Sequence, residues 1–422
     1  MANPENAADR EFDIVLYGAT GFVGKLTAEY LASAGDGARI ALAGRSTDRL
    51  LAVRDSLGEA AHSWPLIEAD ASRPATLEAM AASARVVIST VGPYLRYGLP
   101  LVAACAAAGT DYADLTGEPL FIRECIDLHH KQAVDTGARI VHACGFDSIP
   151  SDLTVFALHR QAERDNAGQL GDTNFVVRRF AGGLSGGTIA SMTNLFREAA
   201  KDPDSRRLLN DPYTLTPDRS AEPELGGQPD ARWRRGRDIA PELDGYWMGA
   251  FAMAIPNSRI VRRTNALLGY TYGKRFEYSE QMSLGRSIVA PLAAAMATGG
   301  NVAVVELGGR LLDRVPERIL ERVLPKPGTG PSERAREQGH YSVETYTTTS
   351  TGARYVARMS QQGDPGYKAT SVLLGESGLA LALDREQLSD LRGVLTPAAA
   401  MGDALLARFN DAGVSLEVSR LH

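Results

Sequence analysis

The first 150 residues repeat one pattern, in which a short apolar run is followed by a longer segment with the spacing of a helix. The apolar runs are FDIVLY, RIALAG, WPLIEAD, RVVISTVG, DYADLTG and RIVHAC. Segments such as KLTAEYLAS, which follows the first run, place apolar side chains three or four residues apart. Short strands that alternate with helices indicate βαβ units. We therefore predict an α/β protein that begins with a doubly wound parallel sheet over residues 1–150.

The pattern changes beyond Pro150. Residues 201–247 are crowded with Asp, Pro, Gly and Arg, which predicts a long loop that serves as a lid, a binding loop or a mobile segment. HYSVETYTTTSTGARYVARMS alternates about a Thr-Gly turn as a β-hairpin does, whereas YKATSVLLGESGLALAL and PAAAMGDALLARFNDAG indicate helices. We expect a mixed α+β substrate domain over residues 151–366, with helices from about 367–422 returning to complete the first domain.

One long segment carries no charge. It runs from Ser287 to Val305, and its 19 residues approach the length of a membrane span, which is about 20 residues. The segment contains Pro291, two glycines and Asn301, and it is rich in alanine rather than leucine. This composition favours a buried helix over an interfacial or acyl-binding element, and it favours a membrane span least.

Length and composition narrow the class of protein. A chain of 422 residues suggests two domains, or one large domain with an insertion. The net charge of −6, with both signs spread along the chain, argues against a nucleic-acid-binding protein. An odd set of cysteines without CxxC spacing, namely Cys105, Cys125 and Cys144, indicates neither a disulfide framework nor a thiolate metal site. The polar N-terminal sequence MANPENAADREFD has no apolar export signal, so we expect a cytoplasmic protein.

The sequence GATGFVG joins the first predicted strand to the first predicted helix. Free N–H groups and the helix dipole make such a junction a site for a pyrophosphate. Glycine allows the sharp turn, the close approach of phosphate and the tight packing of helix on strand. The position between strand and helix predicts a Rossmann-type dinucleotide site, with a tight turn that binds nothing as the alternative. The predicted contacts are Gly18, Thr20, Gly21, Phe22, Val23 and Gly24.

The end of the second strand decides which dinucleotide is bound. A carboxylate there favours NAD, whereas an arginine accommodates the 2′-phosphate of NADP. ALAGRS provides Gly44, Arg45 and Ser46 and no acid, which favours NADP(H); an ordinary surface role for the arginine is the alternative. Asp70 is placed to accept from the adenine amino group, or to cap the helix that follows DASRPAT. The nicotinamide half is expected along Thr90, Val91, Gly92 and Pro93.

Several motifs together carry a family resemblance. GATGFVG, ALAGRS, VGPYLRYG, DYADLTGE, GFDSIPSDL and SGGT resemble the saccharopine dehydrogenase-like oxidoreductases. Over almost the whole chain, including DPYTLT, KPGTGPS and GVLTPAAAMGDALLAR, the sequence is most similar to the mycobacterial-type trans-acting enoyl reductases. The resemblance implies a separate protein that supplies enoyl reduction to a modular polyketide synthase of phthiocerol and phenolphthiocerol lipid synthesis. The implied reaction is an NADPH-dependent reduction of an α,β-unsaturated acyl thioester on an acyl carrier domain.

Such a reaction needs an acid for the α-carbon and donors that stabilise the enolate oxygen. Tyr94 and Tyr97 follow the fourth strand, at the edge where doubly wound folds bind ligands, so one of them is a candidate acid. Aromatic packing under the nicotinamide is the alternative for this pair.

CGFDSIPSD follows the last strand of the first domain and begins a helix. Asp147 and Ser148 are candidates for orienting the substrate or the nicotinamide amide. Ser151 or Asp152 as a helix N-cap would explain half of this motif without a function.

GGLSGGTIAS is a second glycine-rich turn into a predicted helix. Its polar and glycine residues are candidates for binding the thioester carbonyl or a pantetheine phosphate, with a capped helix start as the alternative. The residues concerned are Ser185, Gly186, Gly187 and Thr188.

A basic cluster lies in the long loop, where ARWRRGRD places Arg232, Arg234, Arg235 and Arg237 around Trp233. Carrier proteins are typically acidic, so the cluster is a candidate for docking a carrier, binding phosphate or attracting anionic lipid. A solvated loop is the alternative.

Two further patterns are set aside. Tyr270 to Lys274 matches the YxxxK of short-chain dehydrogenases, yet it lies far beyond the first domain in a stretch that alternates like a strand. The seven histidines, including His129 and His130, show no metal-binding spacing, so we expect no metal.

The leading hypothesis is an NADPH-dependent trans-acting enoyl reductase with a lipid-like acyl substrate and an acyl carrier partner. A saccharopine-type amino-acid oxidoreductase is one alternative, and it would need arginines that converge on a carboxylate in the second domain. A non-enzymatic NADP(H)-binding sensor or scaffold is the other. Residues 287–305 are expected to line an acyl tunnel or to touch a membrane surface.

Overall fold

The computed structural model describes residues 10–35, 37–182, 186, 201–287, 289–296 and 330–422. Its first sheet contains seven parallel strands in the order β13-β6-β5-β4-β1-β2-β3. The strands are β1 (Phe12–Tyr17), β2 (Ile40–Gly44), β3 (Leu66–Glu68), β4 (Ala84–Ser89), β5 (Asp111–Asp114), β6 (Arg139–Val141) and β13 (Gly393–Leu395).

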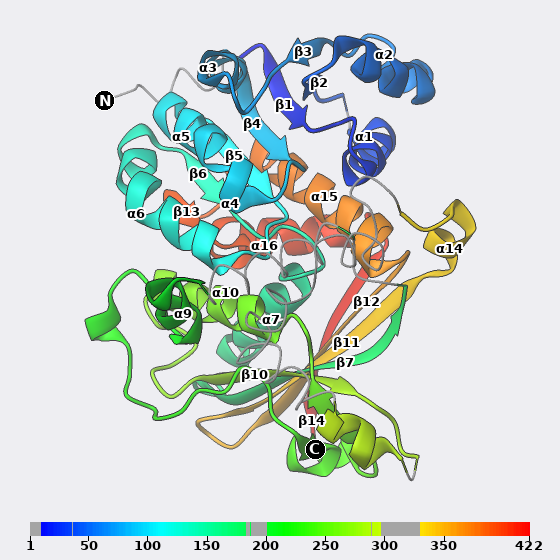
Figure 1. Cartoon of the computed structure of the whole chain (residues 1–422). Coiled ribbons are helices and arrows are strands. Elements are labelled where there is room, and N and C mark those ends of the chain that lie inside the picture. The colour runs from blue at the N-terminus through cyan, green and yellow to red at the C-terminus, as the bar shows by residue number, and fades with distance from the viewer. Residues whose placement is uncertain (1–9, 36, 183–185, 187–200, 288, 297–329) are drawn as a thin grey trace.

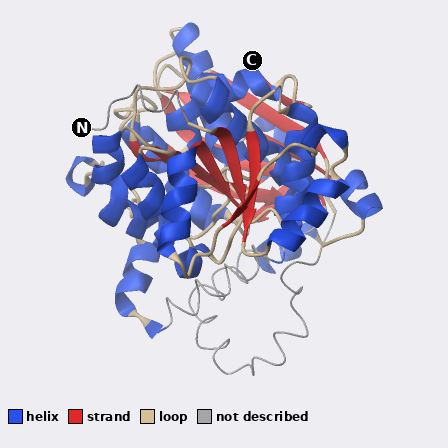
Figure 2. Cartoon of the chain, turned by 90° about the horizontal axis from the view of Figure 1, so that it is seen from above, coloured by secondary structure: helices blue, strands red, loops and turns tan. Residues whose placement is uncertain are grey.

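Helices cover both faces of this sheet (Figure 2). Most strands are therefore buried on both sides, which explains why they read as unbroken apolar runs rather than as alternating ones. The helices that connect or cover the strands are α1 (Phe22–Ala34), α2 (Thr47–Ser56), α3 (Pro74–Ser83), α4 (Tyr94–Tyr97), α5 (Leu99–Ala108), α6 (Pro119–Thr136) and α15 (Thr370–Leu383).

The second sheet is mixed and occupies the lower half of the molecule in Figure 1. Its order is β14-β12-β11-β7-β10-β9-β8, and β7 and β10 are its one parallel pair among the described strands. The strands are β7 (Leu170–Ala181), β8 (Arg234–Arg235), β9 (Trp247–Ala250), β10 (Glu277–Ser283), β11 (His340–Thr349), β12 (Arg354–Gln362) and β14 (Val414–Leu421). The predicted doubly wound parallel sheet with a second mixed domain is confirmed.

Three helices lie between the two sheets, namely α7 (Ile149–Arg164), α10 (Ala254–Leu267) and α16 (Pro397–Phe409) (Figure 1). A buried carboxylate joins all three. Asp152 of α7 accepts the hydroxyl of Thr264 and, at 2.8 Å, the backbone N–H of Ala398. Burial raises the pKa of Asp152 to about 7, because these neutral donors compensate little of the lost hydration.

The long polar segment after residue 200 is anchored by arginines of α10. Arg259, Arg262 and Arg263 donate to the backbone carbonyls of residues 209, 212 and 215. Asp230, further along the same segment, pairs with Arg259 at 2.5 Å and with Arg262 at 3.1 Å. These contacts fix residues 201–247 to the body, which argues against a mobile segment, whereas the lid and the binding loop stay predictions.

Short elements complete this segment and the connections around it. The helices are α9 (Pro203–Asn210) and α14 (Glu333–Gln338). Single turns lie at Glu59–Ala61, Arg219–Ala221, Gly236–Asp238, Pro241–Leu243 and Pro365–Ala369.

The end of the chain contributes to both sheets. The predicted hairpin is confirmed as β11 and β12, and the two predicted helices are α15 and α16. Between them, β13 pairs with β6 in the first sheet, whereas β14 pairs with β12 in the second. Residues 367–422 therefore do not all return to the first domain.

Two smaller sequence expectations fail. Tyr270 to Lys274 form a turn between α10 and β10 rather than a strand. In the uncharged segment, residues 290–296 are helical. Leu292 and Met296 of this helix and Val289 just before it are exposed, so the described part is not a buried helix. Ile288 and residues 297–305 lie outside the described residues. No described helix has the length and apolarity needed to cross a membrane.

Candidate functional site

The candidate site lies where the strand order of the first sheet reverses. β1 pairs with β2 on one side and with β4 on the other, so the connections after β1 and β4 leave the sheet in opposite directions. In doubly wound folds the crevice at this point, beyond the carboxyl ends of the strands, binds the ligand. The predicted glycine loop follows β1, and the predicted nicotinamide strip follows β4.

The glycine loop packs against the end of β4 without room for side chains. Gly18 has a φ of +89°, and a Cβ there would lie 2.7 Å from both Thr90 Oγ1 and Val91 Cγ2. A Cβ on Gly24 would lie 2.1 Å from the carbonyl oxygen of Gly18. The hydroxyl of Thr90 donates to that same oxygen at 3.1 Å. These contacts fix the start of α1 beside the β4 loop.

The remaining backbone N–H groups of the loop suit a pyrophosphate. The Gly21 N–H donates to the Gly18 oxygen, and Lys25 is the first residue whose N–H donates into α1. The N–H groups of Phe22, Val23 and Gly24 have no acceptor inside the helix. A Cβ on Gly21 would meet the Gly18 oxygen at 3.2 Å and nothing else within 4 Å, so a ligand can approach this side. The predicted cradle therefore fits the phosphates of a dinucleotide.

The structure places Arg45 at the end of β2 with its side chain exposed. Hydrogen bonds from the N–H and hydroxyl of Ser72 lower the pKa of Asp70, and the charge of Arg45 lowers it further. Ser46 caps α2 by accepting from the Arg49 N–H at 3.5 Å. The alternative role of Asp70 as a helix N-cap is wrong, because α3 begins after Arg73 and Asp70 accepts from Ser72.

The two candidate tyrosines of α4 have different surroundings. Tyr94 is buried, and its hydroxyl donates to the carbonyl of Ser89 at 3.0 Å. Burial, followed by the charge of Asp114, raises the pKa of Tyr94 well above the usual value. Tyr97 is half-buried, with the guanidinium of Arg96 5.1 Å from its ring centroid. Of the two, Tyr97 is the one that a substrate can reach.

Asp147 lies in the connection between β6 and α7 with its side chain partly exposed. Its Oδ2 is 3.9 Å from the place that a Cβ on Gly117 would take, and Met253 Cε borders that place at 3.2 Å. Its charge also raises the pKa of Tyr94. Burial raises the pKa of Asp147 itself to about 7. A carboxyl group with this pKa is half protonated at neutral pH, which suits an acid catalyst.

Ser148 begins a buried polar chain that reaches the second sheet. Its hydroxyl donates to Asn257 Oδ1 at 2.9 Å, and Asn257 Nδ2 donates to Glu280 at 3.0 Å. Tyr278 donates its hydroxyl to the other oxygen of Glu280 at 2.7 Å. Burial raises the pKa of Glu280 to about 8. The Ser148 hydroxyl donates its proton to Asn257, and this chain of hydrogen bonds links the loop after β6 to β10 of the second sheet.

The alternative explanation of the Asp147 motif by helix capping is wrong. Ser151 and Asp152 lie inside α7, whose N-cap is Ser148. Asp152 caps a different helix, because it accepts the N–H of Ala398 at the start of α16.

Of the second glycine turn, Gly186 is described, while Ser185, Gly187 and Thr188 lie outside the described residues. The Gly186 N–H donates to the hydroxyl of Tyr367 at 3.0 Å, so this amide is not free to bind a carbonyl or a phosphate. Tyr367 in turn packs edge-on against Phe22, with the ring centroids 4.9 Å apart. The fold therefore brings Gly186 close to the first glycine loop.

The basic cluster divides into an inner and an outer pair. Arg234 donates to Asn174 at 3.0 Å and lies 3.9 Å from Asp172, and Arg232 lies 3.4 Å from Glu277. These two arginines therefore support the second sheet, and the solvated-loop interpretation is wrong for them.

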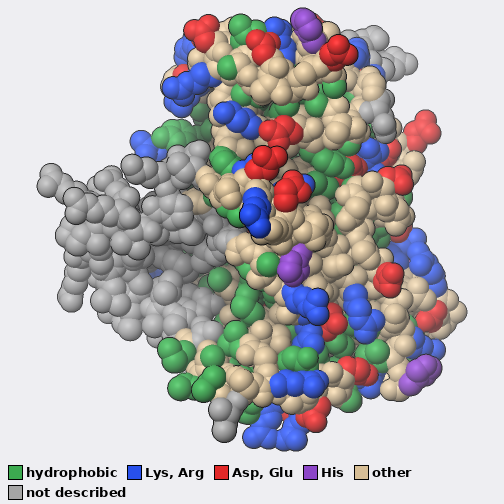
Figure 3. All heavy atoms as spheres, turned by 90° about the vertical axis from the view of Figure 1, so that its right-hand side faces the viewer, with side chains coloured by type: hydrophobic (Ala, Val, Ile, Leu, Met, Phe, Trp, Pro, Cys, Tyr) green, Lys and Arg blue, Asp and Glu red, His purple; other side chains and the backbone are tan. Residues whose placement is uncertain are grey.

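The outer pair, Arg235 and Arg237, is exposed. Trp233 is 50% exposed and stacks on Trp247, with the ring centroids 5.4 Å apart. Figure 3 shows hydrophobic and basic side chains gathered at the lower end of one face. Arg235, Arg237 and half of Trp233 are therefore open to solvent.

Sequence reasoning missed the acids of DYADLTGE as site residues. Asp114 ends β5, is fully buried, and accepts from His142 Nδ1 at 2.8 Å and from the Ala143 N–H at 3.1 Å. Glu118 is also buried and accepts from the N–H groups of Tyr94 and Leu95. The signal that could have revealed them is one acid at the last position of a strand and a second acid four residues later, at the edge of the sheet where ligands bind.

Known proteins resemble this chain over its length. Residues 14–141 match the family model described as the saccharopine dehydrogenase NADP binding domain. A Mycobacterium tuberculosis protein is 68% identical over 98% of this chain and 99% of its own length. The trans-acting enoyl reductase of Mycobacterium ulcerans is 63% identical over 99% of this chain and 100% of its own length. The chain belongs to the trans-acting enoyl reductase family. The resemblance seen in the motifs is confirmed.

Among solved structures, the saccharopine dehydrogenase (L-Glu forming) of Saccharomyces cerevisiae aligns with 97% of this chain and 99% of its own. The two are 13% identical, with a TM-score of 0.49.

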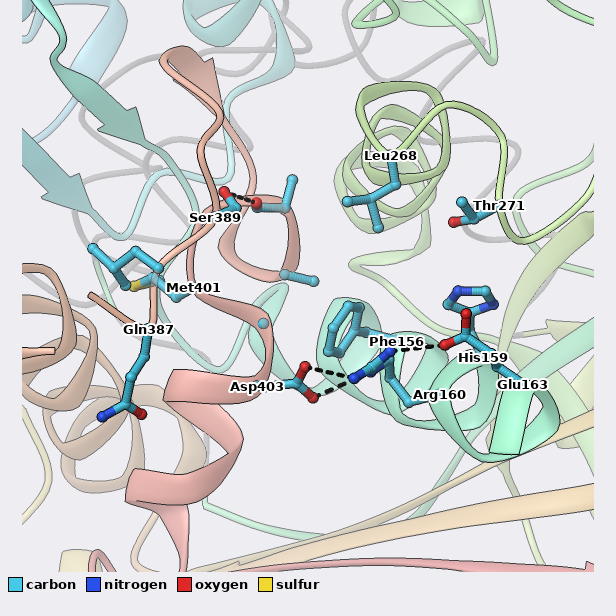
Figure 4. Close-up of a pocket in the computed structure, with 14 residues that line it drawn as sticks. Phe156, His159, Arg160, Glu163, Leu268, Thr271, Gln387, Ser389, Met401 and Asp403 are labelled. Atoms are coloured by element: carbon cyan, nitrogen blue, oxygen red, sulfur yellow. Dashed lines mark hydrogen bonds and ion pairs between the residues drawn. The ribbon is translucent and has the colours of Figure 1, made fainter. Parts of the chain in front are cut away.

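A cavity of about 380 Å³ lies against the second half of α7 (Figure 4), and Asp147 is not among its lining residues. Phe156, Leu268 and neighbouring apolar residues form its walls. Arg160 at its floor pairs with Asp403 at 3.1 Å and with Glu163 at 2.7 Å. Because both carboxylates match this guanidinium, the cavity offers little attraction to an anionic substrate.

The glycine loop yields a prediction about two substitutions. Gly21 has φ −73° and ψ 166°, which valine tolerates, so Gly21→Val should fold but weaken NADPH binding about 100-fold, or ~2.8 kcal/mol. Gly24→Ala should also lower the thermal midpoint, because its Cβ overlaps the Gly18 oxygen. Calorimetric titration with NADPH and thermal unfolding measure the two effects. Wild-type affinity in Gly21→Val would contradict the loop assignment.

Arg45 yields a prediction about cofactor choice. NADPH should bind at least about tenfold more tightly than NADH, or ~1.4 kcal/mol, because the exposed guanidinium after β2 would attract the 2′-phosphate that NADH lacks. Arg45→Asp should remove that difference and leave NADH binding nearly unchanged. Arg275→Asp, an exposed charge reversal in the second domain, is the control. Equal affinities of the wild-type protein for both cofactors would refute the assignment.

Proposed function

We propose that this protein is an NADPH-dependent trans-acting enoyl reductase of complex lipid synthesis. Its substrate is an α,β-unsaturated acyl thioester on the acyl carrier domain of a polyketide synthase. The observation that carries the proposal is similarity over nearly the full length to proteins named trans-acting enoyl reductases. The site geometry supports the proposal, because the glycine loop that suits a pyrophosphate and the partly exposed acid Asp147 lie at the same end of the first sheet.

NADPH, when bound, would supply a hydride to the β-carbon of the substrate. The free N–H groups of α1 would hold its pyrophosphate, and Arg45 with Ser46 would bind the 2′-phosphate. The nicotinamide half would lie along residues 90–93, which pack against Gly18.

The protein must also supply a proton to the α-carbon of the substrate. Asp147 is the preferred acid, because its pKa of about 7 keeps a proton available at neutral pH and its side chain is partly exposed. Tyr97 is the second candidate. Tyr94 is better suited to packing, since its hydroxyl is buried and bonded to a carbonyl. We also propose that Ser185, Gly187 and Thr188 contact the substrate, whereas the amide of Gly186 is already bonded to Tyr367.

The arginines of α10 give little support to a saccharopine-type reaction on amino acids. Arg259 and Arg262 pair with Asp230, and Arg263 donates to two backbone carbonyls. The guanidinium groups of α10 are therefore occupied within the protein rather than converging on an open site.

Assays of NADPH oxidation separate the three functions that the sequence left open. The proposal requires oxidation with enoyl thioesters and formation of the saturated product. Oxidation with keto acid and amine pairs alone would establish the amino-acid oxidoreductase. Tight NADPH binding without turnover of either substrate class would establish a sensor or scaffold.

A pH prediction tests the acid. Because burial raises the pKa of Asp147 from 3.8 to about 7, the protonated form prevails below pH 7, and kcat should fall as pH rises through that value. Asp147→Asn should lower kcat about 100-fold and flatten the profile, with NADPH affinity retained. Asp390→Asn, at an exposed position, is the control. A preserved profile in Asp147→Asn, with kcat lost in Tyr97→Phe, would transfer the role to Tyr97.

The exposed surface around Trp233 is the proposed docking site for the acidic carrier in the cytoplasm. The double variant Arg235→Glu/Arg237→Glu should raise KM for carrier-bound substrate about tenfold, or ~1.4 kcal/mol, by reversing the attraction. A short free enoyl thioester should be reduced as before. Equal effects on the two substrates, or none on either, would reject docking here. Arg275→Glu controls for the change in net charge.

Exposed apolar side chains near this surface suit a lipid-like acyl chain or a membrane surface. Val289, Leu292 and Met296 are each more than 60% exposed, and they follow β10, which pairs with β9. Burial of such side chains against hydrocarbon is favourable by about 0.8 kcal/mol per methylene. We propose that these three side chains contact the acyl chain or a membrane surface.

A further inference from the structure

One buried carboxylate, that of Glu118, holds the turn that follows β4. Glu118 lies just before α6, and its Oε1 accepts the N–H of Tyr94 while its Oε2 accepts the N–H of Leu95, both at 3.0 Å. These are the first two N–H groups of α4, which have no acceptor inside that helix. One side chain thus satisfies both groups and places negative charge at the positive end of the turn.

Residues 114–118 also hold the loop after β6, which carries the proposed acid Asp147. Asp114 Oδ1 accepts the N–H groups of Ala143 and Thr116, both at 3.1 Å. The Thr116 hydroxyl then accepts the N–H of Glu118 at 3.2 Å. Residues 114–118 therefore connect the β4 loop on one side with the β6 loop on the other.

We propose that Glu118 is a positioning residue, which sets the place of residues 90–97 relative to the nicotinamide and the proposed acid. The inference rests on the proposed function, because it takes the nicotinamide half to lie along Thr90–Pro93. The carboxylate acts through the backbone of α4 and touches neither cofactor nor substrate.

A shift of α4 would change the distance over which the hydride is transferred. Residues 90–93 leave β4 and enter α4 directly, so a shift at the first turn of α4 is passed to the strip that would hold the nicotinamide. Hydride transfer is sensitive to such shifts, and a displacement of about 1 Å lowers rates by up to ~100-fold. The pyrophosphate cradle at Gly18–Gly24 also has an anchor outside α4, because the Gly18 N–H donates to the carbonyl of Ala43 in β2 at 2.9 Å. Thr90, which donates to the Gly18 oxygen, is itself bonded to Tyr17 of β1 through its N–H at 3.0 Å.

The test compares Glu118→Gln and Glu118→Ala with the wild type, and Glu124→Gln in the helix that follows Glu118 is the matched control. Glutamine keeps one acceptor and loses the other, whereas alanine loses both. Hydrogen exchange of the Tyr94 and Leu95 amides, measured without cofactor, should be slowest in the wild type and fastest in the alanine variant. Glu124→Gln should exchange as the wild type does.

Two further measurements connect the turn to the cofactor. The fluorescence lifetime of protein-bound NADPH should change in Glu118→Gln, while the NADPH dissociation constant should stay within about threefold, or ~0.7 kcal/mol. With an enoyl thioester, kcat should fall about 10- to 100-fold with little change in KM, and the isotope effect with 4-deuterated NADPH should rise.

Several results would overturn the assignment. Unchanged amide exchange in both Glu118 variants would show that the carboxylate does not hold α4. Faster exchange with an unchanged lifetime of bound NADPH would show that α4 does not position the nicotinamide. Equal losses of kcat, NADPH affinity and thermal midpoint would indicate a merely structural role. Failure of the proposed function is distinguishable, because the wild type would then not reduce enoyl thioesters, whereas exchange and lifetime still report on Glu118.

Discussion

The close packing of Gly18 against the side chains of Thr90 and Val91 determines the rest of the edge where the cofactor is proposed to bind. Gly18 lies so close to the β4 loop that even a methyl group would overlap it, and Gly24 packs against the Gly18 carbonyl with less room still. Interiors are packed too densely to absorb such overlaps without a backbone shift. This close packing directs the N-terminus of α1 toward the crevice between β1 and β4. It also makes the β4 loop a wall of the same crevice.

A second constraint comes from buried guanidinium groups in α10. Arg263 is fully buried and donates to the carbonyls of residues 215 and 394, which belong to the long polar segment and to β13. Burial lowers the pKa of Arg263 to about 9, so it remains charged at neutral pH and requires those acceptors. A segment whose composition is that of a loop is thereby held in place by charge-assisted hydrogen bonds.

The sequence predicted the parts of this structure that depend on local pattern. Buried strands, amphipathic helices and a glycine loop between strand and helix are visible in neighbouring residues, and the placing of Gly18 to Gly24 at the sheet edge followed from them. Interactions between residues far apart in the sequence could not be predicted from local pattern. Asp152 caps a helix at Ala398, and Ser148 reaches Glu280 through Asn257. Composition alone made residues 201–247 a loop, because the arginines that fix it lie in another element.

The position of β13 affects how the chain is made. This strand pairs with β6, yet about 250 residues separate the two in the sequence. At roughly 5–20 residues per second, a ribosome completes β6 at least ten seconds before β13 emerges. During that interval the edge of β6 exposes hydrogen-bonding groups that other chains could pair with. The first sheet is therefore not a unit that finishes folding alone, and shortening the chain ahead of β13 should promote aggregation rather than release a free cofactor-binding domain.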